Sequence, residues 1–174
     1  MATLNTTNIK HASSSSNNIV LASDGTLALA GQTGPAWFGS QDTSITLPED
    51  TITKIINLGN DAINTSGWDE STGTFTVPSG KGGIYFFTGA VGVDDMDANE
   101  FINLYLHVNG SQVGPRAHTR VDQGTDDYNH ACNGTWMRSL SAGDTVALHA
   151  KVSDNDSSIT TIENMTWFGG FKIA

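Results

Sequence analysis

The sequence predicts an all-β protein, an antiparallel jelly-roll β-sandwich preceded by an extended N-terminal arm. Residues 82–93, GGIYFFTGAVGV, leave neither face of a strand polar, so both faces of this strand are expected to be buried. No stretch of ten or more residues repeats apolar positions at helical spacing, which excludes the crossover helices that a parallel sheet needs. Eight or so short strands separated by turn signals are typical of a two-sheet sandwich or jelly roll.

Residues 1–34 differ in composition from the rest of the chain. A polar Ser and Asn run is flanked by short apolar clusters, which cannot build a core alone. This segment is either a disordered tail or an anchor arm that orders against a partner or against copies of itself. Gly34 and Pro35 separate it from a globular head, residues 35–174. The expected anchor residues are the apolar ones: Ile9, Ile19, Val20, Leu21, Leu27 and Leu29.

The head consists of strands and turns. Asn109-Gly110 tolerates the positive backbone angles of a tight hairpin, so the strand before it, with its alternating Ile and Leu positions, should pair with the strand after it. A second tight turn is expected at 142–144. The expected strands are residues 44–47, 51–58, 74–77, 82–93, 101–108, 111–117, 135–140, 145–152 and 165–173.

Alternate loops of a jelly roll lie at opposite ends. The long acidic loops around residues 94–99, 118–130 and 153–163 should therefore meet at one end, and the short turns at the other. The last strand finishes at the short-turn end and the first strand should pair antiparallel with it, so the arm leaves from that end. The acidic loops then form a distal binding face, with these candidate residues: Asp94, Asp95, Asp97, Asp122, Asp126, Asp127 and Tyr128.

Clustered carboxylates suit calcium, which takes 6 to 8 oxygen ligands. A calcium site would be formed by Asp94, Asp95 and Asp97; the alternative is that these are acidic loop residues exposed to solvent. No other cofactor is expected. The histidines have no metal-ligand spacing, and no Ser-His-Asp arrangement or phosphate-binding loop is evident. We therefore expect a binding protein and not an enzyme.

Charge and hydropathy limit the partners. A formal net charge of −10 repels nucleic acids and anionic membranes, so neither is an expected partner. No stretch approaches the roughly 20 apolar residues of a membrane span, and the first residues do not resemble a signal peptide. A single cysteine, Cys132, cannot form an intrachain disulfide, as expected of a chain that folds in a reducing cytoplasm.

Four segments in order carry a family resemblance: FTVPSGKGGIYFFTGAV, INLYLHVNG, LSAGDTVALHA and WFGGFKIA. Over about residues 36–174 the chain resembles the globular heads of the complement C1q and tumour necrosis factor (TNF) superfamily. That family forms tight trimers, so the resemblance implies a homotrimer with one face of strand 84–93 in the core and the other against neighbouring subunits. Core or interface positions would be Tyr85, Phe86, Phe87, Val91, Trp167 and Phe171, with the choice between Tyr85 and Phe86 for the threefold axis left open.

The arm carries a second resemblance. Residues 8–26, NIKHASSSSNNIVLASDGT, are similar to leader segments of virion fibre and appendage proteins of tailed phages. This implies a virion surface protein, assembled in the host cytoplasm: a short head fibre, a capsid decoration or a tail fibre knob. It would dock to a capsid or tail protein through residues 1–34 and present its apical loops to a host receptor or glycan. The alternative is a secreted C1q-like trimeric binding or signalling module.

Overall fold

The computed structural model describes residues 8–9, 12, 19–21, 27–29, 34–121, 128–153 and 158–174, and the chain divides into two compact units. The first comprises residues 1–34 with Ala174. In it, β1 (Asn8–Ile9), β2 (Ile19–Leu21) and β3 (Leu27–Leu29) form an antiparallel three-stranded sheet. The six expected anchor residues all lie on these strands, so the described part of the arm is folded back on itself and not extended.

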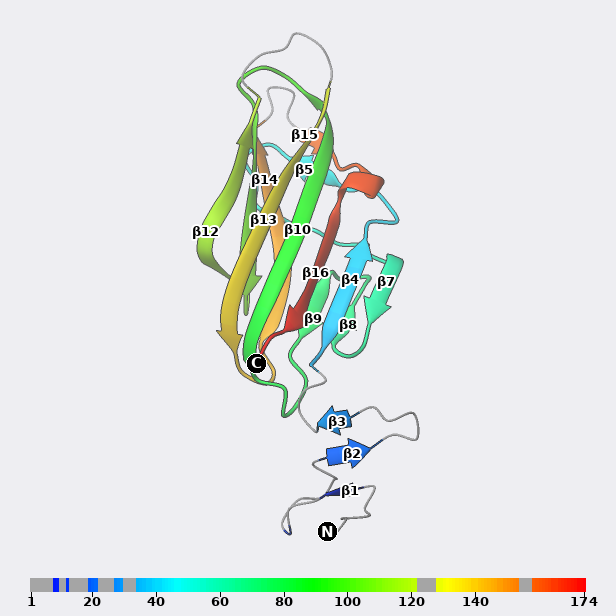
Figure 1. Ribbon diagram of the computed structural model, residues 1–174. Helices are drawn as coiled ribbons and strands as arrows, with labels where there is room; N and C mark the ends of the chain where they lie inside the picture. The colour runs from blue at the N-terminus through cyan, green and yellow to red at the C-terminus, as the bar shows by residue number, and fades with distance from the viewer. Residues whose placement is uncertain are drawn as a thin grey trace. The chain divides into compact units, whose positions relative to one another are not determined.

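The second unit, residues 35–173, contains two antiparallel sheets (Figure 1). The five-stranded sheet has the order β13 (Tyr128–Leu140), β10 (Gly83–Met96), β16 (Trp167–Lys172), β4 (Ala36–Ser40) and β7 (Asn60–Asn64). The six-stranded sheet has the order β12 (Ser111–Arg120), β11 (Phe101–Val108), β14 (Thr145–Ser153), β9 (Thr74–Thr76) and β8 (Trp68–Asp69), with β6 (Thr53–Lys54) also paired to β14.

A smaller sheet of β5 (Thr46–Pro48) and β15 (Ser158–Thr160) and the 3-10 helix η1 (Glu163–Met165) complete the described part of this unit. The expected all-β antiparallel sandwich is therefore confirmed. Among the described residues, no helix has the length and apolar character needed to cross a membrane.

The core lies between the two large sheets. Tyr85, Phe87 and Val91 of β10 are fully buried in it, while Phe86 points to the other side of the five-stranded sheet and is only partly covered. The question left open by the sequence is thus answered for a single chain: Tyr85 is a core residue. Trp37 stacks on Phe75 across the sandwich, with ring centroids 3.7 Å apart. Each such side chain contributes about 1.5–3 kcal/mol through its burial.

The strands β4, β7, β8 and β15 were not expected, and two expected strands differ most in their boundaries. The segment 51–58 contains only the short strand β6, because Asn57 has a φ of 60° and the chain turns there. Ile55 and Leu58 still fill the core, and their N–H groups donate to Leu148 and Glu70 carbonyls. At 128–140 the strand is longer than expected, because β13 pairs with β10 along almost its whole length.

The two ends of the second unit differ. At the distal end, β10, β12 and β14 finish, and Asn99 donates to the Val121 carbonyl at 2.7 Å. At the proximal end the two short turns meet, with Asn109 donating to the Thr145 carbonyl at 2.9 Å. The chain enters this unit at the proximal end, where Lys172 donates to the Pro35 carbonyl at 3.0 Å (Figure 1). The arm is therefore joined to the head at the short-turn end, as expected.

Candidate functional site

The five-stranded sheet turns an apolar surface away from the core. We call it the outer face; its apolar side chains are Phe38, Ile63, Ile84, Phe86, Met137, Trp167 and Phe171. Cross-strand register places Phe86 between Met137 on β13 and Phe171 on β16. The exposed fractions are 59% for Met137, 56% for Ile63, 48% for Phe171 and 46% for Ile84. Exposed apolar side chains gathered on one sheet mark an interaction surface.

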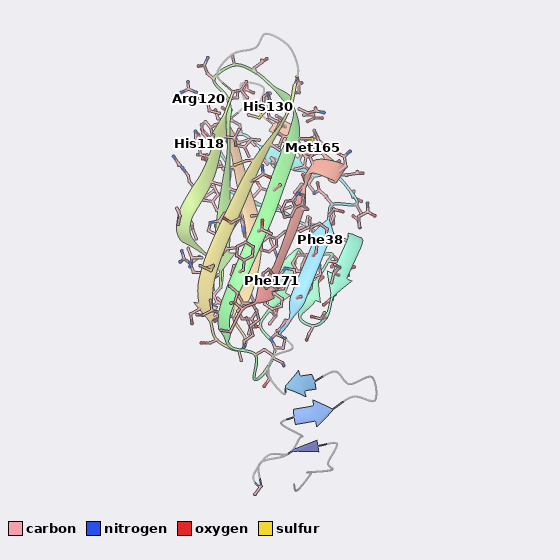
Figure 2. The ribbon with its side chains drawn as sticks, in the orientation of Figure 1. Phe38, His118, Arg120, His130, Met165 and Phe171 are labelled. Carbon is pink, nitrogen blue, oxygen red and sulfur yellow. The ribbon has the colours of Figure 1, made fainter. Side chains whose placement is uncertain are left out.

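Alternation along β16 builds much of the outer face. In the sequence WFGGF, Phe168 points into the core, while Trp167 and Phe171 point outward. Phe171 lies 5.4 Å from Phe86, and Trp167 lies 5.8 Å from Phe38, both measured between ring centroids. These contacts cover only part of each ring, since Phe171 remains about half exposed. Figure 2 shows Phe38 and Phe171 on neighbouring strands of this sheet.

Met165 closes the outer face toward the distal end. A Cβ on Gly92 of β10 would collide with the Met165 side chain, so the close approach of η1 to this strand requires glycine there. Ala90, two residues earlier, is only 2% exposed. The exposed part of the outer face therefore lies between Met165 and the proximal end.

Positive charge gathers along one long side of the sandwich, where β13 of the five-stranded sheet lies next to β12 of the six-stranded sheet. All three arginines of the chain, Arg116, Arg120 and Arg138, lie on β12 and β13, where the Trp136 indole N–H donates to the Pro115 carbonyl and joins the two strands. We call this side the basic edge; Figure 2 shows Arg120 there with His118 and His130.

The opposite side of the five-stranded sheet, beyond β16, carries exposed carboxylates. Asp42 follows β4, and Glu163 lies on η1. We call this side, defined by Asp42 and Glu163, the acidic edge.

An open pocket of about 420 Å³ lies beside η1, toward the distal end. Asp94 and Glu163 both line it, together with hydroxyl and amide side chains such as Ser44 and Asn164. An Asp94 carboxylate oxygen accepts the Thr160 N–H at 3.1 Å, and Glu163 Oε1 accepts both the N–H and the hydroxyl of Ser44 at 3.2 Å. Both carboxylates are thus positioned by hydrogen bonds.

The other expected binding residues do not join this pocket. Asp95 has a φ of 56° at the irregular end of β10, and the Asp97 N–H donates to Glu100 Oε2 at 2.7 Å. Within the described ranges, no three His, Cys, Asp or Glu side chains come together to hold a metal ion. Asp122, Asp126 and Asp127 lie outside the described residues; Tyr128 opens β13 opposite Met96, but its side chain lies outside them too.

The expected interface positions did not name four residues of the outer face: Phe38, Ile63, Ile84 and Met137. Met137 was detectable, because it is an apolar residue at a position that pairing with strand 84–93 turns away from the core. Ile63 was not, since β7 has the sequence NDAIN, with no strand signal. The large aromatics Trp68, Tyr105 and Trp136 are each 5–6% exposed and are therefore not available for stacking on a sugar.

No family model matches this chain, and no curated protein sequence matches it. Solved structures do match, and they are jelly-roll domains of the C1q and TNF type. The globular domain of zebrafish complement 1qA aligns with a TM-score of 0.54 and 15% identity, covering 80% of this chain and 98% of that one.

Murine APRIL at pH 5.0 gives a TM-score of 0.55 at 12% identity, covering 81% of this chain and 100% of that one. Eiger TNF from S. frugiperda gives a TM-score of 0.52 at 15% identity, covering 82% of this chain and 94% of that one. The head thus has the C1q/TNF-like jelly-roll fold, and at these identities the likeness concerns the fold alone.

Proposed function

We propose that this protein is a homotrimeric binding head of a tailed-phage virion, assembled through its outer face. The observation that carries the proposal is the apolar outer face, where four of the six exposed large hydrophobic residues of the described chain lie on one sheet. A surface of this kind is stable in water when another protein surface covers it. A second copy of the same chain is the occupant that we propose.

Charge complementarity supports a contact between copies. The basic edge carries Arg116, Arg120 and Arg138, and the acidic edge carries Asp42 and Glu163. The basic edge runs along β13 and the neighbouring β12 of the other sheet, and the acidic edge lies across the outer face from it, beyond β16. In the proposed head-to-tail contact, the basic edge of one copy would meet the acidic edge of the next. Such a contact closes into a ring when successive rotations return to the first subunit without a shift along the axis, and the resemblance to C1q and TNF heads favours a ring of three.

The opposite placement of the two ends supports an attachment role. The arm is joined at Pro35, at the proximal end, and Asp94, the expected binding residue that lines the pocket beside η1, lies toward the distal end. Residues 1–34, whose sequence resembles phage leader segments, would dock to a capsid or tail protein and so hold the head on the virion surface. The distal end would then contact a host receptor or glycan, and several linked copies would strengthen weak binding. Labelling of intact particles tests this location.

The second candidate is a secreted trimeric binding or signalling module. The fold similarity to complement 1qA, APRIL and Eiger favours it. Absence of the protein from purified particles, together with a signal peptide encoded upstream, would support this alternative. Both candidates are binding proteins; depolymerisation of a host polysaccharide by the purified protein would contradict both.

Sedimentation equilibrium of the purified chain and of Met137→Glu tests the assembly. We expect a trimer for the natural chain and a monomer for Met137→Glu, because three buried carboxylates would face an apolar contact. Ile52→Glu is the matched control: Ile52 is 46% exposed but lies beside β6, outside the outer face. A natural chain that remains monomeric at micromolar concentration, or equal dissociation by both variants, would contradict the proposal.

Calcium binding stays a prediction, now centred on Asp94 because this residue lines the distal pocket. A thermal melt in calcium and in chelator tests it, and an unchanged midpoint argues against a calcium site.

A further inference from the structure

A second pocket lies on the six-stranded sheet, on the opposite side of the sandwich from the outer face. It has a volume of about 230 Å³, and its lining residues are Lys54, Thr74, His107, Gly110, Thr145, Ala147 and His149. His107 and His149 follow the core residues Leu106 and Leu148 on neighbouring strands, so both imidazoles point away from the core. No residue of the assembly contact proposed above lines this pocket, so a ligand could enter it in the monomer and in the trimer alike.

The two imidazoles form a stacked pair with unused ring nitrogens. Their centroids are 3.8 Å apart and their planes differ by 17°. His107 Nε2 and His149 Nδ1 are buried, and neither atom forms a hydrogen bond with a described residue. Buried polar atoms are normally hydrogen-bonded, so two such atoms in one pocket indicate a missing partner.

A lysine lies beside the pair. Lys54 on β6 is directly opposite His149 in the strand register, and its ammonium group donates to the Thr74 hydroxyl at 2.5 Å. Burial lowers the pKa of Lys54, while the carboxylate of Asp69 acts in the opposite direction. The Asp69 carboxylate itself is exposed and accepts hydrogen bonds from Ser71 and Thr72.

The geometry excludes a metal ion as the missing partner of both rings. A metal bound by two imidazoles must lie in both ring planes, about 2.0–2.1 Å from each nitrogen. Stacked, nearly parallel rings offer no such point, and the positive charge of Lys54 opposes a cation. An anion has the opposite preference, because it is attracted by Lys54 and accepts hydrogen bonds from hydroxyl and N–H groups.

We propose that this pocket binds one oxyanion, a carboxylate, sulfate or phosphate group, together with one proton taken up from solvent by His149. The protonated imidazole then donates its free N–H to an anion oxygen, and the Lys54 ammonium group supplies a further donor. No covalent bond forms or breaks. The neutral His107 ring, stacked against the imidazolium, stabilises it by a cation–π contact.

The surroundings of His149 favour uptake of a proton only with the anion. Burial, the neighbouring His107 and the Lys54 charge lower the pKa of His149 to about 4, while a backbone hydrogen bond with Ala147 acts in the opposite direction, so the ring is neutral near pH 7. The other ionisable groups near it are Tyr105, directly opposite on β11, and Lys151, which pairs with Asp50 at 3.0 Å. The remaining neighbouring strands, β9 and β12, bring Thr74 and Gln112 toward the pair, and neither side chain ionises.

The proposal fixes how affinity depends on pH. Because the complex holds one proton more than the free protein, affinity should rise about tenfold for each pH unit by which pH falls, until His149 is protonated in the free protein. Sulfate is a suitable probe because its charge is constant over this range. We expect sulfate at constant ionic strength to raise the titration midpoint of the His149 ring, followed by NMR of its carbon-bound protons, by about one pH unit or more.

Substitutions of the two lysines distinguish an anion-binding site from a pair of histidines that only packs. Lys54→Gln should weaken sulfate binding about tenfold or more, since it removes a close charge from the pocket. Lys54→Arg should retain most of it, and Lys151→Gln, a lysine on β14 outside the pocket lining, is the matched control. Glucuronate in place of sulfate shows whether a sugar carboxylate also enters; binding of either anion supports the proposal. An unchanged His149 midpoint with both anions, or equal weakening by Lys54→Gln and Lys151→Gln, would overturn it.

Discussion

Replacing His149 by glutamine should make the head more resistant to acid than the natural protein. The folded state lowers the pKa of His149 from 6.5 to about 4, mainly through burial. A group whose pKa is lower in the folded state than in the unfolded state contributes to stability at pH values above its unfolded-state pKa. This contribution is lost as the pH falls toward the folded-state pKa. At about 1.4 kcal/mol per pH unit, about 2.5 kcal/mol is lost between about pH 7.5 and about pH 4.5.

Urea unfolding of both proteins, in sulfate-free buffer and at one protein concentration, measures this loss. Carboxylates titrate in both proteins and cancel in the comparison, so the difference isolates His149. We expect the free energy of unfolding of the natural protein to fall about 2.5 kcal/mol further than that of His149→Gln over this interval. Equal losses in the two proteins would refute the argument, because they would show that burial does not keep the imidazole neutral.

Three further substitutions test the packing of the head by urea unfolding. Phe87→Ala, at a fully buried position, should cost about 3–5 kcal/mol, and a cost below about 1 kcal/mol would contradict the assigned core. Gly39→Ala should cost about 1–3 kcal/mol, because its Cβ would collide with the backbone carbonyl of Leu58. Asn109→Ala should cost about 1–3 kcal/mol, since Asn109 has a φ of 51° and bonds the Thr145 N–H and Asp144. Asn109→Gly should recover only the part of this cost that comes from the positive φ. In both variants NMR should show a higher pKa for Asp144, because the Asn109 hydrogen bond lowers it.

Periodicity predicted the parts of the fold that depend on a two-residue repeat. The strands β11 and β14 carry aliphatic residues at alternate positions, and the inward Leu104 and Leu148 are fully buried, although Asn103 and Tyr105 on the other face of β11 are buried too. Strand 82–93 was expected to be apolar on both faces, and β10 places Phe87 in the core and Phe86 on the outer face. Local alternation was sufficient in these strands because each pairs along its length with long neighbours.

The pocket on the six-stranded sheet could not be predicted in the same way. Alternation places His107 and His149 on one side of their strands, but their stacking depends on the register between β11 and β14. Lys54 comes from a two-residue strand with no periodic signal, and its position opposite His149 depends on tertiary packing. The distal acidic cluster shows the converse: closeness in sequence did not bring Asp94, Asp95 and Asp97 to one metal site in the described chain.

The antiparallel pairing of β4 with β16 has a mechanical consequence for a head tethered through its arm. Tension on the arm is applied at Pro35 and pulls β4 along its own length, past the five register pairs that run from Ser40 opposite Trp167 to Ala36 opposite Phe171. The hydrogen bonds between the strands are perpendicular to this pull, so they share the force and must shear together. A strand peeled from one end would instead lose its bonds one at a time. In the proposed attachment role, a pull between the arm and a ligand at the distal end would therefore load the β4–β16 pairing in shear.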